Sequence, residues 1–265
     1  MAGTVVETVD RARVEIDLDA GCRLASLEIE GREILVGRSA SPLEWGCYPM
    51  APYAGRVRAG RFAFRGRTHD LPRILGGHAI HGSVFIRPWE PEGGHWYSTE
   101  LGPHWPFPGW ARQQIRLERD RLAMRLEVHA AAGAMPASCG WHPWFRRVID
   151  GARVRLTADL GFVFERDSDG IATRRRLPVP AEPWDDCFGD VSQPVGLTWP
   201  GVLRLDLAAS SDYWVIYTER DEAVCVEPQT APPDVLNQDP FIVEPGRPLV
   251  TEFTMAWSSP RQPAP

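Results

Sequence analysis

The amino-acid sequence predicts an all-β protein built as one large antiparallel β-sandwich. Side chains alternate between apolar and polar with a period of two along much of the chain, and helical spacing of apolar residues is nearly absent. Twenty-four glycines and 25 prolines separate the alternating runs, as expected for a sandwich with many connections. A chain of 265 residues fits this fold as one unit, because all-β domains often reach that size.

The expected strands follow one another along the chain. Alternating runs predict strands or strand pairs in residues 12–19, 23–36, 61–71, 114–130, 154–158, 203–207 and 249–257. Turns at Glu30–Gly31 and near Gly66 would close two hairpins. In residues 122–128 every second side chain is apolar, which predicts one face of a strand in the core.

Loops and domain limits are predicted from proline and from the absence of repeats. The proline-rich stretches 102–108, 178–183 and 228–233 are expected to be loops, because proline cannot donate a hydrogen bond within a central strand. We find no internal repeat and no low-complexity linker. The sequence therefore predicts one domain over residues 1–258, followed by a flexible C-terminal tail at 259–265.

Composition excludes several classes of function. All 29 basic residues are arginine, so chemistry that needs a lysine amine, such as a Schiff base or a P-loop, is absent. The net charge of −6 does not favour a nucleic-acid partner. Five scattered cysteines, no apolar leader and no membrane-length apolar run together predict a cytoplasmic protein without a membrane partner.

Histidines and an arginine mark two candidate segments in the first third of the chain. Arg56 follows Gly55 at an expected strand entry, where a solvated turn arginine is the simpler interpretation. His78 and His81 are three residues apart and could bind a metal. No further ligand cluster with suitable spacing is present, so the sequence predicts no metal site.

Three later segments carry residues suited to acid–base chemistry or sugar binding. His142 lies among aromatic residues that include Trp144, and such surroundings disfavour its charged form. Glu227 ends an apolar run, so it is either a structural acid or a general base with a raised pKa. Asp185 and Asp186 could accept hydrogen bonds from sugar hydroxyls or belong to a turn.

Together, these segments resemble the aldose 1-epimerases, or galactose mutarotases, over nearly the whole chain and in the family's order. The matching stretches are PYAGRVRAGRFAFRG, HGSVFIRPW, GWHPWF, WDDCF and CVEPQTAPPDVLNQDPFIVEPG. The last stretch is long and specific. The resemblance implies a galactose mutarotase-like supersandwich, in agreement with the period of two found independently. The sequence departs from the family's pattern at Gly55, Ser83 and Arg146–Arg147, which concerns the identity of the sugar.

Roles for individual residues follow from the resemblance. Glu227 corresponds to the general base and His142 to the general acid. Arg56, His81 and Asp185 correspond to groups that bind the sugar, and Asp186 is an adjacent competitor for the role of Asp185. Apart from the resemblance, Trp144 is a candidate to stack on the sugar ring, and the alternative is that it fills the core of the sandwich. The resemblance implies interconversion of the α and β anomers of an aldohexose without a cofactor, by a monomer or weak homodimer.

Alternative functions predict different features of the site. A hexose-6-phosphate 1-epimerase needs an arginine cluster for the phosphate. Candidates for that cluster are Arg58, Arg61, Arg87, Arg146 and Arg147. A non-catalytic carbohydrate-binding protein could dispense with Glu227 and His142. A glycoside hydrolase would need paired carboxylates, whereas only Glu227 stands out.

Overall fold

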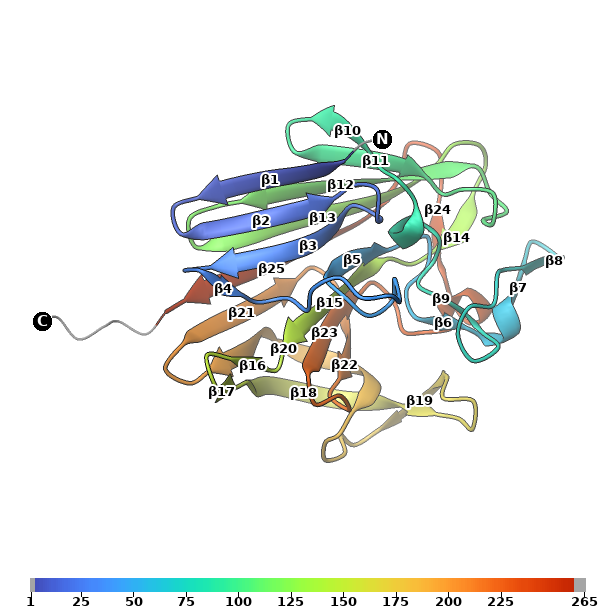
Figure 1. Ribbon diagram of the computed structural model, residues 1–265. Coiled ribbons are helices and arrows are strands. Elements are labelled where there is room, and N and C mark those ends of the chain that lie inside the picture. The colour runs from blue at the N-terminus through green and yellow to red at the C-terminus, as the bar shows by residue number, and fades with distance from the viewer. Residues whose placement is uncertain (1–2, 260–265) are drawn as a thin grey trace, which may run out of the picture.

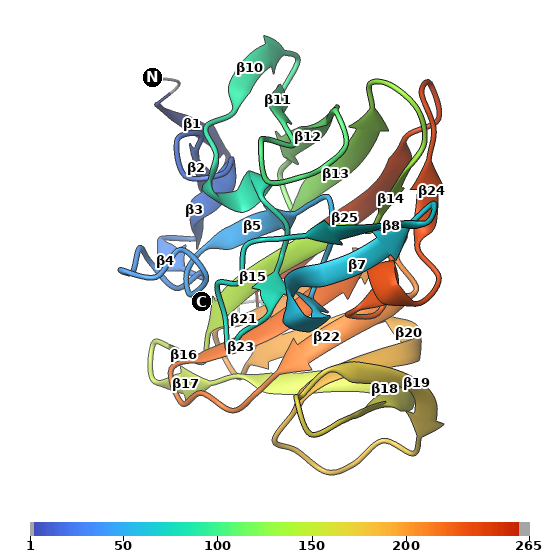
Figure 2. The same ribbon diagram turned by 90° about the vertical axis from the view of Figure 1, so that its right-hand side faces the viewer.

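The computed structural model describes residues 3–259, which form two stacked antiparallel sheets. In spatial order, the first sheet comprises β10 (Glu90–Gly93), β11 (Trp96–Glu100), β12 (Gly109–Leu117), β13 (Arg121–Ala130), β25 (Leu249–Ser258) and β21 (Leu203–Ala209). The second comprises β1 (Thr4–Val9), β2 (Ala12–Asp17), β3 (Arg23–Ile29), β5 (Cys47–Met50), β15 (Gly140–Arg146), β23 (Ala223–Gln229) and β22 (Tyr213–Tyr217). Figure 2 separates the layers, with β1–β3 on one side and β12, β13 and β25 on the other.

Two long strands join the sheets along one edge. β20 (Asp185–Trp199) pairs with β22 through residues 185–189 and with β21 through residues 195–199. β18 (Arg155–Arg166) runs beside β20 over most of its length, and β19 (Ala172–Leu177) pairs with the end of β18. The prediction of a large antiparallel β-sandwich is confirmed, and β20 belongs to both of its sheets.

Short elements cover the edges and one face of the second sheet. They are β4 (Arg32–Glu33), β6 (Arg56–Val57), β7 (Arg61–Phe64), β8 (Arg67–Asp70), β9 (Ala79–Ile80), β14 (Met135–Ala137), β16 (Val148–Ile149), β17 (Ala152–Arg153), β24 (Phe241–Val243), and the 3-10 turns η1 (Arg58–Gly60), η2 (Val84–Ile86) and η3 (Val235–Asn237). The β7–β8 hairpin turns at Arg65–Gly66, as predicted, and projects from the body of the molecule in Figure 1. The turn at Glu30–Gly31 is also confirmed between β3 and β4.

The main core lies between the two sheets because alternation along each strand places one set of side chains there. On β13 the buried side chains are Leu122, Met124, Leu126 and Val128, which form the predicted apolar face. Trp141 of the second sheet meets Phe253 of the first, with ring centroids 5.8 Å apart. Burying such a side chain contributes about 1.5–3 kcal/mol, so this layer fixes how the two sheets stack.

The limits of the predicted domain are described only in part. Residues 260–265 of the predicted tail lie outside the described residues, so the boundary at residue 258 stays a prediction. Between residues 3 and 259, no helix has the length and apolar character needed to cross a bilayer.

Candidate active site

A row of side chains across five strands of the second sheet forms the floor of a pocket. The pairing of Gly140 with Gln229 and of Trp144 with Cys225 places His142 of β15 directly opposite Glu227 of β23. His142 is also opposite Tyr48 of β5. On the other side, Glu227 is opposite Val215 of β22, which in turn is opposite Cys187 of β20. Alternation turns all five side chains away from the main core and toward the pocket.

Two prolines open the strand pairing at this row. The β15–β23 ladder is interrupted between its pairs at Gly140 and Trp144, where Pro143 and Pro228 lack an N–H. Pro228 therefore lies inside a central strand, and the prediction that residue 228 begins a loop is wrong by two residues. The proline is tolerated because its pairing with Trp214 on the other neighbour continues and the missing N–H falls at the interrupted ladder. The interruption lies beside the candidate catalytic pair.

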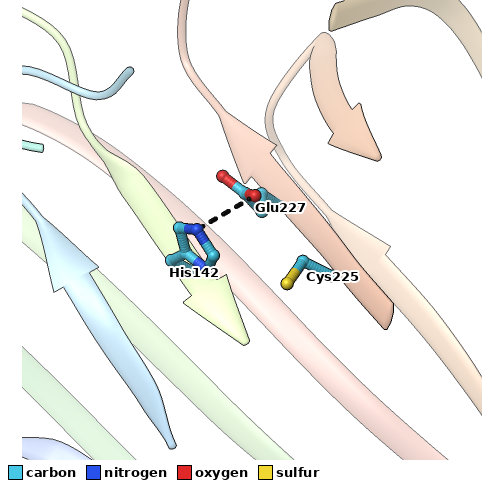
Figure 3. A group of neighbouring side chains, drawn as sticks. All are labelled: His142, Cys225 and Glu227. Atoms are coloured by element: carbon cyan, nitrogen blue, oxygen red, sulfur yellow. Dashed lines mark ion pairs between the residues drawn. The ribbon is translucent and has the colours of Figure 1, made fainter. Parts of the chain in front are cut away.

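His142 and Glu227 face each other at close range in a buried setting. His142 Nε2 is 3.2 Å from Glu227 Oε1, and the side chains are 9% and 3% exposed (Figure 3). Gln229, two residues further along β23, donates a hydrogen bond from Nε2 to Glu227 Oε2 at 3.3 Å. The amide therefore fixes the second carboxylate oxygen and leaves the first one facing the imidazole.

Burial keeps the pair neutral as a whole. Desolvation, followed by the nearby negative charge of Asp185, raises the pKa of Glu227 well above its usual value. Desolvation, followed by the positive charge of Arg23, lowers the pKa of His142 to about 3. Both shifts favour a protonated carboxyl beside a neutral imidazole. Moving this single proton across the 3.2 Å contact converts the neutral pair into a carboxylate and an imidazolium with no change in total charge.

Aromatic rings hold the imidazole in place. His142 stacks on Tyr48 and on Trp144, with centroid separations of 4.9 and 5.2 Å. The Tyr48 hydroxyl and the Trp144 indole N–H both donate to the carbonyl oxygen of Leu43, at 3.1 and 2.8 Å. Because both rings are anchored at their polar ends, they restrict rotation of His142 and keep Nε2 directed at Glu227.

His81 is a second buried histidine at the same pocket, and its hydrogen bonding defines its tautomer. Gly55 N–H donates to His81 Nδ1 at 3.3 Å, so the ring proton resides on Nε2. Burial, followed by Coulomb interaction with His142 and with the positively charged Arg56, lowers the pKa of His81 well below its usual value. Gly55 has a φ of +70°, and a Cβ there would lie 2.8 Å from the Pro233 ring, which explains the glycine at this departure from the family's pattern.

Arginines and aspartates form a charged wall on the pocket. Arg166 contacts Asp185 Oδ2 at 2.9 Å and Asp186 Oδ1 at 3.1 Å. Arg56 lies 3.6 Å from the same oxygen of Asp185. Asp185 is also the acidic neighbour whose charge acts on Glu227. Both aspartates line the pocket, but only Asp185 forms ion pairs with both arginines and also acts electrostatically on Glu227.

The pocket brings the predicted site residues together. It has a volume of about 330 Å³, within the range of roughly 300–1,000 Å³ typical of small-molecule sites. All seven residues predicted for the site line it, namely Arg56, His81, His142, Trp144, Asp185, Asp186 and Glu227. The structure thus gives these side chains one location, and their individual roles stay predictions.

The five arginines considered for a phosphate site lie elsewhere. None of them lines the pocket among the described residues. Arg58 pairs with Asp167 and Asp169, and Arg61 pairs with Asp70. Arg147 is buried and donates to backbone carbonyl oxygens at Thr218 and Ala223. These guanidinium groups serve structural contacts.

Several pocket residues were not found from the sequence. They are Tyr48, Arg166, Tyr217, Glu219, Arg220 and Gln229. Gln229 was within the quoted CVEPQ stretch, and its position two residues after Glu227 on a strand could have indicated a shared face. Arg166 had no local signal, because the aspartates that it contacts are about 20 positions away.

A supersandwich with a buried carboxyl–imidazole pair on the floor of an open pocket defines a class of protein equipped for proton transfer to a small molecule. A sequence model described as aldose 1-epimerase matches residues 10–255. This chain belongs to the aldose 1-epimerase family. A curated relative, the uncharacterized protein YphB of Escherichia coli K12, is 28% identical over 139 residues, which span 49% of this chain and 46% of YphB.

Solved structures of proteins from several organisms have the same fold. The GalM/aldose epimerase homologue from C. elegans has a TM-score of 0.83 at 15% identity, covering 98% of this chain and 99% of the other. A galactose mutarotase-like protein from Clostridium acetobutylicum has a TM-score of 0.83 at 14% identity, with coverages of 97% and 95%. Galactose 1-epimerase from Lactobacillus acidophilus has a TM-score of 0.79 at 15% identity, with coverages of 96% and 94%. At these identities the likeness establishes the fold alone.

Proposed function

We propose that this protein is an aldose 1-epimerase that interconverts the α and β anomers of a neutral aldohexose. The observation that carries the proposal is the 3.2 Å approach of His142 Nε2 to Glu227 Oε1 on the floor of the pocket. Family membership supports a sugar as the substrate. Mutarotation requires one proton to be removed and another to be delivered, and the pair holds one mobile proton for this purpose.

The reaction begins from the charge-separated form of the pair. Glu227, as the carboxylate, removes the proton from the anomeric O1 hydroxyl while the His142 imidazolium delivers a proton to the ring oxygen O5. The C1–O5 bond breaks and the open-chain aldehyde forms. Glu227 is then protonated and His142 neutral, which is the form that burial favours. Rotation about C1–C2 followed by the reverse transfers closes the ring as the other anomer.

Other pocket residues would bind and orient the sugar. His81 carries its proton on Nε2 and provides a second N–H donor for the ring oxygen. Asp185 accepts hydrogen bonds from hydroxyl groups, and Arg56 donates to them. Trp144 is largely buried and stacked on His142, so it would support sugar binding by holding the imidazole at the pocket.

Charge on the pocket wall supports a neutral sugar over a phosphorylated one. The two arginines near the aspartates, Arg56 and Arg166, are already balanced by Asp185 and Asp186. At the other end, Arg220 pairs with Glu44 at 2.6 Å and with Glu222 at 3.3 Å. A phosphate would therefore meet no uncommitted guanidinium on this wall.

Exchange of the two anomers measured by NMR saturation transfer tests the proposal directly. The panel contains free aldohexoses and their 6-phosphates, each with and without the protein. We expect faster exchange for at least one free aldohexose. Folded protein that accelerates none of these sugars would refute the proposal, and acceleration confined to 6-phosphates would replace it with the hexose-6-phosphate 1-epimerase.

A further inference from the structure

A buried thiol lies beside the candidate catalytic pair and has no part in the proposed reaction. Cys225 precedes Glu227 by two residues on β23, so both side chains lie on the same face of the strand. It is opposite Trp144, which makes it the diagonal neighbour of His142 across the strand pair. Figure 3 shows the thiol, the carboxyl and the imidazole around one gap between β15 and β23.

The three side chains have the donor types and spacing of a metal site. One ligand atom each from His142, Cys225 and Glu227 lies within 4.8 Å of the other two. Tetrahedral Zn²⁺ has bonds of about 2.0–2.3 Å, so its ligand atoms are about 3.3–3.6 Å apart. The His142–Glu227 contact of 3.2 Å already matches one edge of that tetrahedron. A shift of about 1 Å at the thiol would complete the other two edges.

The surroundings restrict which cation fits and how it enters. Mixed sulfur, nitrogen and oxygen donors favour Zn²⁺ or Cd²⁺, whereas Mg²⁺ and Ca²⁺ prefer oxygen ligands alone. His142 and Glu227 line the pocket, so a cation can reach them from that side, while Cys225 is fully buried beside them. Stacking on Tyr48 and Trp144 pre-orients the imidazole as a ligand. The fourth coordination position then faces the pocket.

We infer that His142, Cys225 and Glu227 form an inhibitory site for Zn²⁺ and similar soft divalent cations. On binding, Cys225 and Glu227 each release one proton to solvent and coordinate as the thiolate and the carboxylate, and His142 coordinates through neutral Nε2. Both proton-transfer atoms are then bound to the cation, and the pocket floor is blocked. Inhibition rests on the proposed function, whereas binding of the cation does not.

Titration of chelator-treated, full-length protein with Co²⁺ tests the binding directly. We expect one equivalent to produce thiolate-to-cobalt charge-transfer absorption, which Zn²⁺ abolishes by displacement. Cys225→Ala should lose this absorption and bind Zn²⁺ at least tenfold more weakly in calorimetry, with Cys225→Ser as a second variant if alanine impairs folding. Cys187→Ala is the matched control, because this thiol lies on the same row of the sheet and lines the pocket; it should retain the absorption.

Activity measurements separate this inference from the proposed function. We expect Zn²⁺ to slow anomer exchange, EDTA to restore it, and Cys225→Ala to require at least tenfold more Zn²⁺ for the same inhibition. Wild-type protein without the charge-transfer absorption, or a Cys225→Ala variant that keeps it, would overturn the metal site whatever the activity. A cobalt–thiolate signal in a protein that accelerates no sugar would leave the site standing and refute the proposed function alone.

Discussion

Replacing Glu227 with glutamine is predicted to remove the proposed base while preserving the shape of the pocket floor. Glutamine has nearly the same volume and can still accept a hydrogen bond from Gln229 Nε2, which contacts the carboxyl at 3.3 Å in the wild type. A positioned acid or base contributes about 10²–10⁴-fold in rate. The loss corresponds to about 2.7–5.5 kcal/mol in the activation barrier.

The same variant is predicted to become relatively more stable as pH rises. The folded-state pKa of Glu227 is raised by burial, so above the ordinary glutamate pKa the unfolded chain releases a proton that the folded chain keeps. Wild-type stability therefore falls with pH, by up to about 1.4 kcal/mol per pH unit, until the pH reaches the folded-state pKa. Glutamine does not titrate, so Glu227→Gln lacks this loss.

Two assays, with one control, decide the outcome. Anomer exchange is measured by NMR on an accepted sugar, and the free energy of unfolding is measured in urea at about pH 5 and about pH 8. Glu90→Gln, an exposed substitution on β10, should change neither quantity. Near-wild-type exchange in Glu227→Gln would refute the base assignment. A stability difference between wild type and Glu227→Gln that is the same at both pH values would refute the reasoning on burial.

Four further predictions follow from the same geometry. His142→Asn should slow exchange by about 10²–10⁴-fold. The folded-state pKa of His142 is lowered to about 3, so the wild type loses up to about 5 kcal/mol of stability as the pH falls from 6.5 to 3, and the variant should not show this loss; acid unfolding curves identical to the wild type would contradict this. Arg56→Ala should raise KM at least tenfold with a smaller effect on kcat, and a change confined to kcat would exclude a binding role. Arg166→Gln should shift the acidic limb of the pH–rate profile to higher pH. Asp185 loses the positive charge 2.9 Å away, so its negative charge raises the pKa of Glu227 further; an unchanged limb would count against this coupling. Leu126→Ala should lower the free energy of unfolding by about 2–5 kcal/mol in urea denaturation while kcat stays unchanged, since Leu126 is fully buried between the sheets and away from the pocket.

Much of the site was predictable because its residues occur in short segments with distinctive chemistry. His142 among aromatic residues and Glu227 after an apolar run were both identified from local sequence, and both line the pocket. Arg166 was not identified, because an arginine at the end of a strand has no local pattern that distinguishes it from any solvated arginine. Its position depends on the pairing of β18 with β20, which brings it to Asp185 and Asp186.

The five arginines considered for a phosphate site show the same limit of prediction from local sequence. All five lie in or next to the candidate segments of the sequence, but none lines the pocket among the described residues, and Arg58 and Arg61 pair with Asp167 and Asp70 instead. Sequence proximity to a site segment does not give side-chain direction, because alternate residues of a strand face opposite sides of the sheet.

By itself, the sequence determined the fold class and, along its alternating runs, which segments become strands and which face of each strand enters the core. The period of two does this locally, because burial of alternate apolar side chains stabilises only one face. Only the tertiary structure decided which strands lie side by side. Pairing of β15 with β23 sets His142 opposite Glu227 across 85 positions of the chain, and this register depends on the packing of both sheets at once. The acid–base pair is therefore a product of long-range strand order, which no single segment encodes.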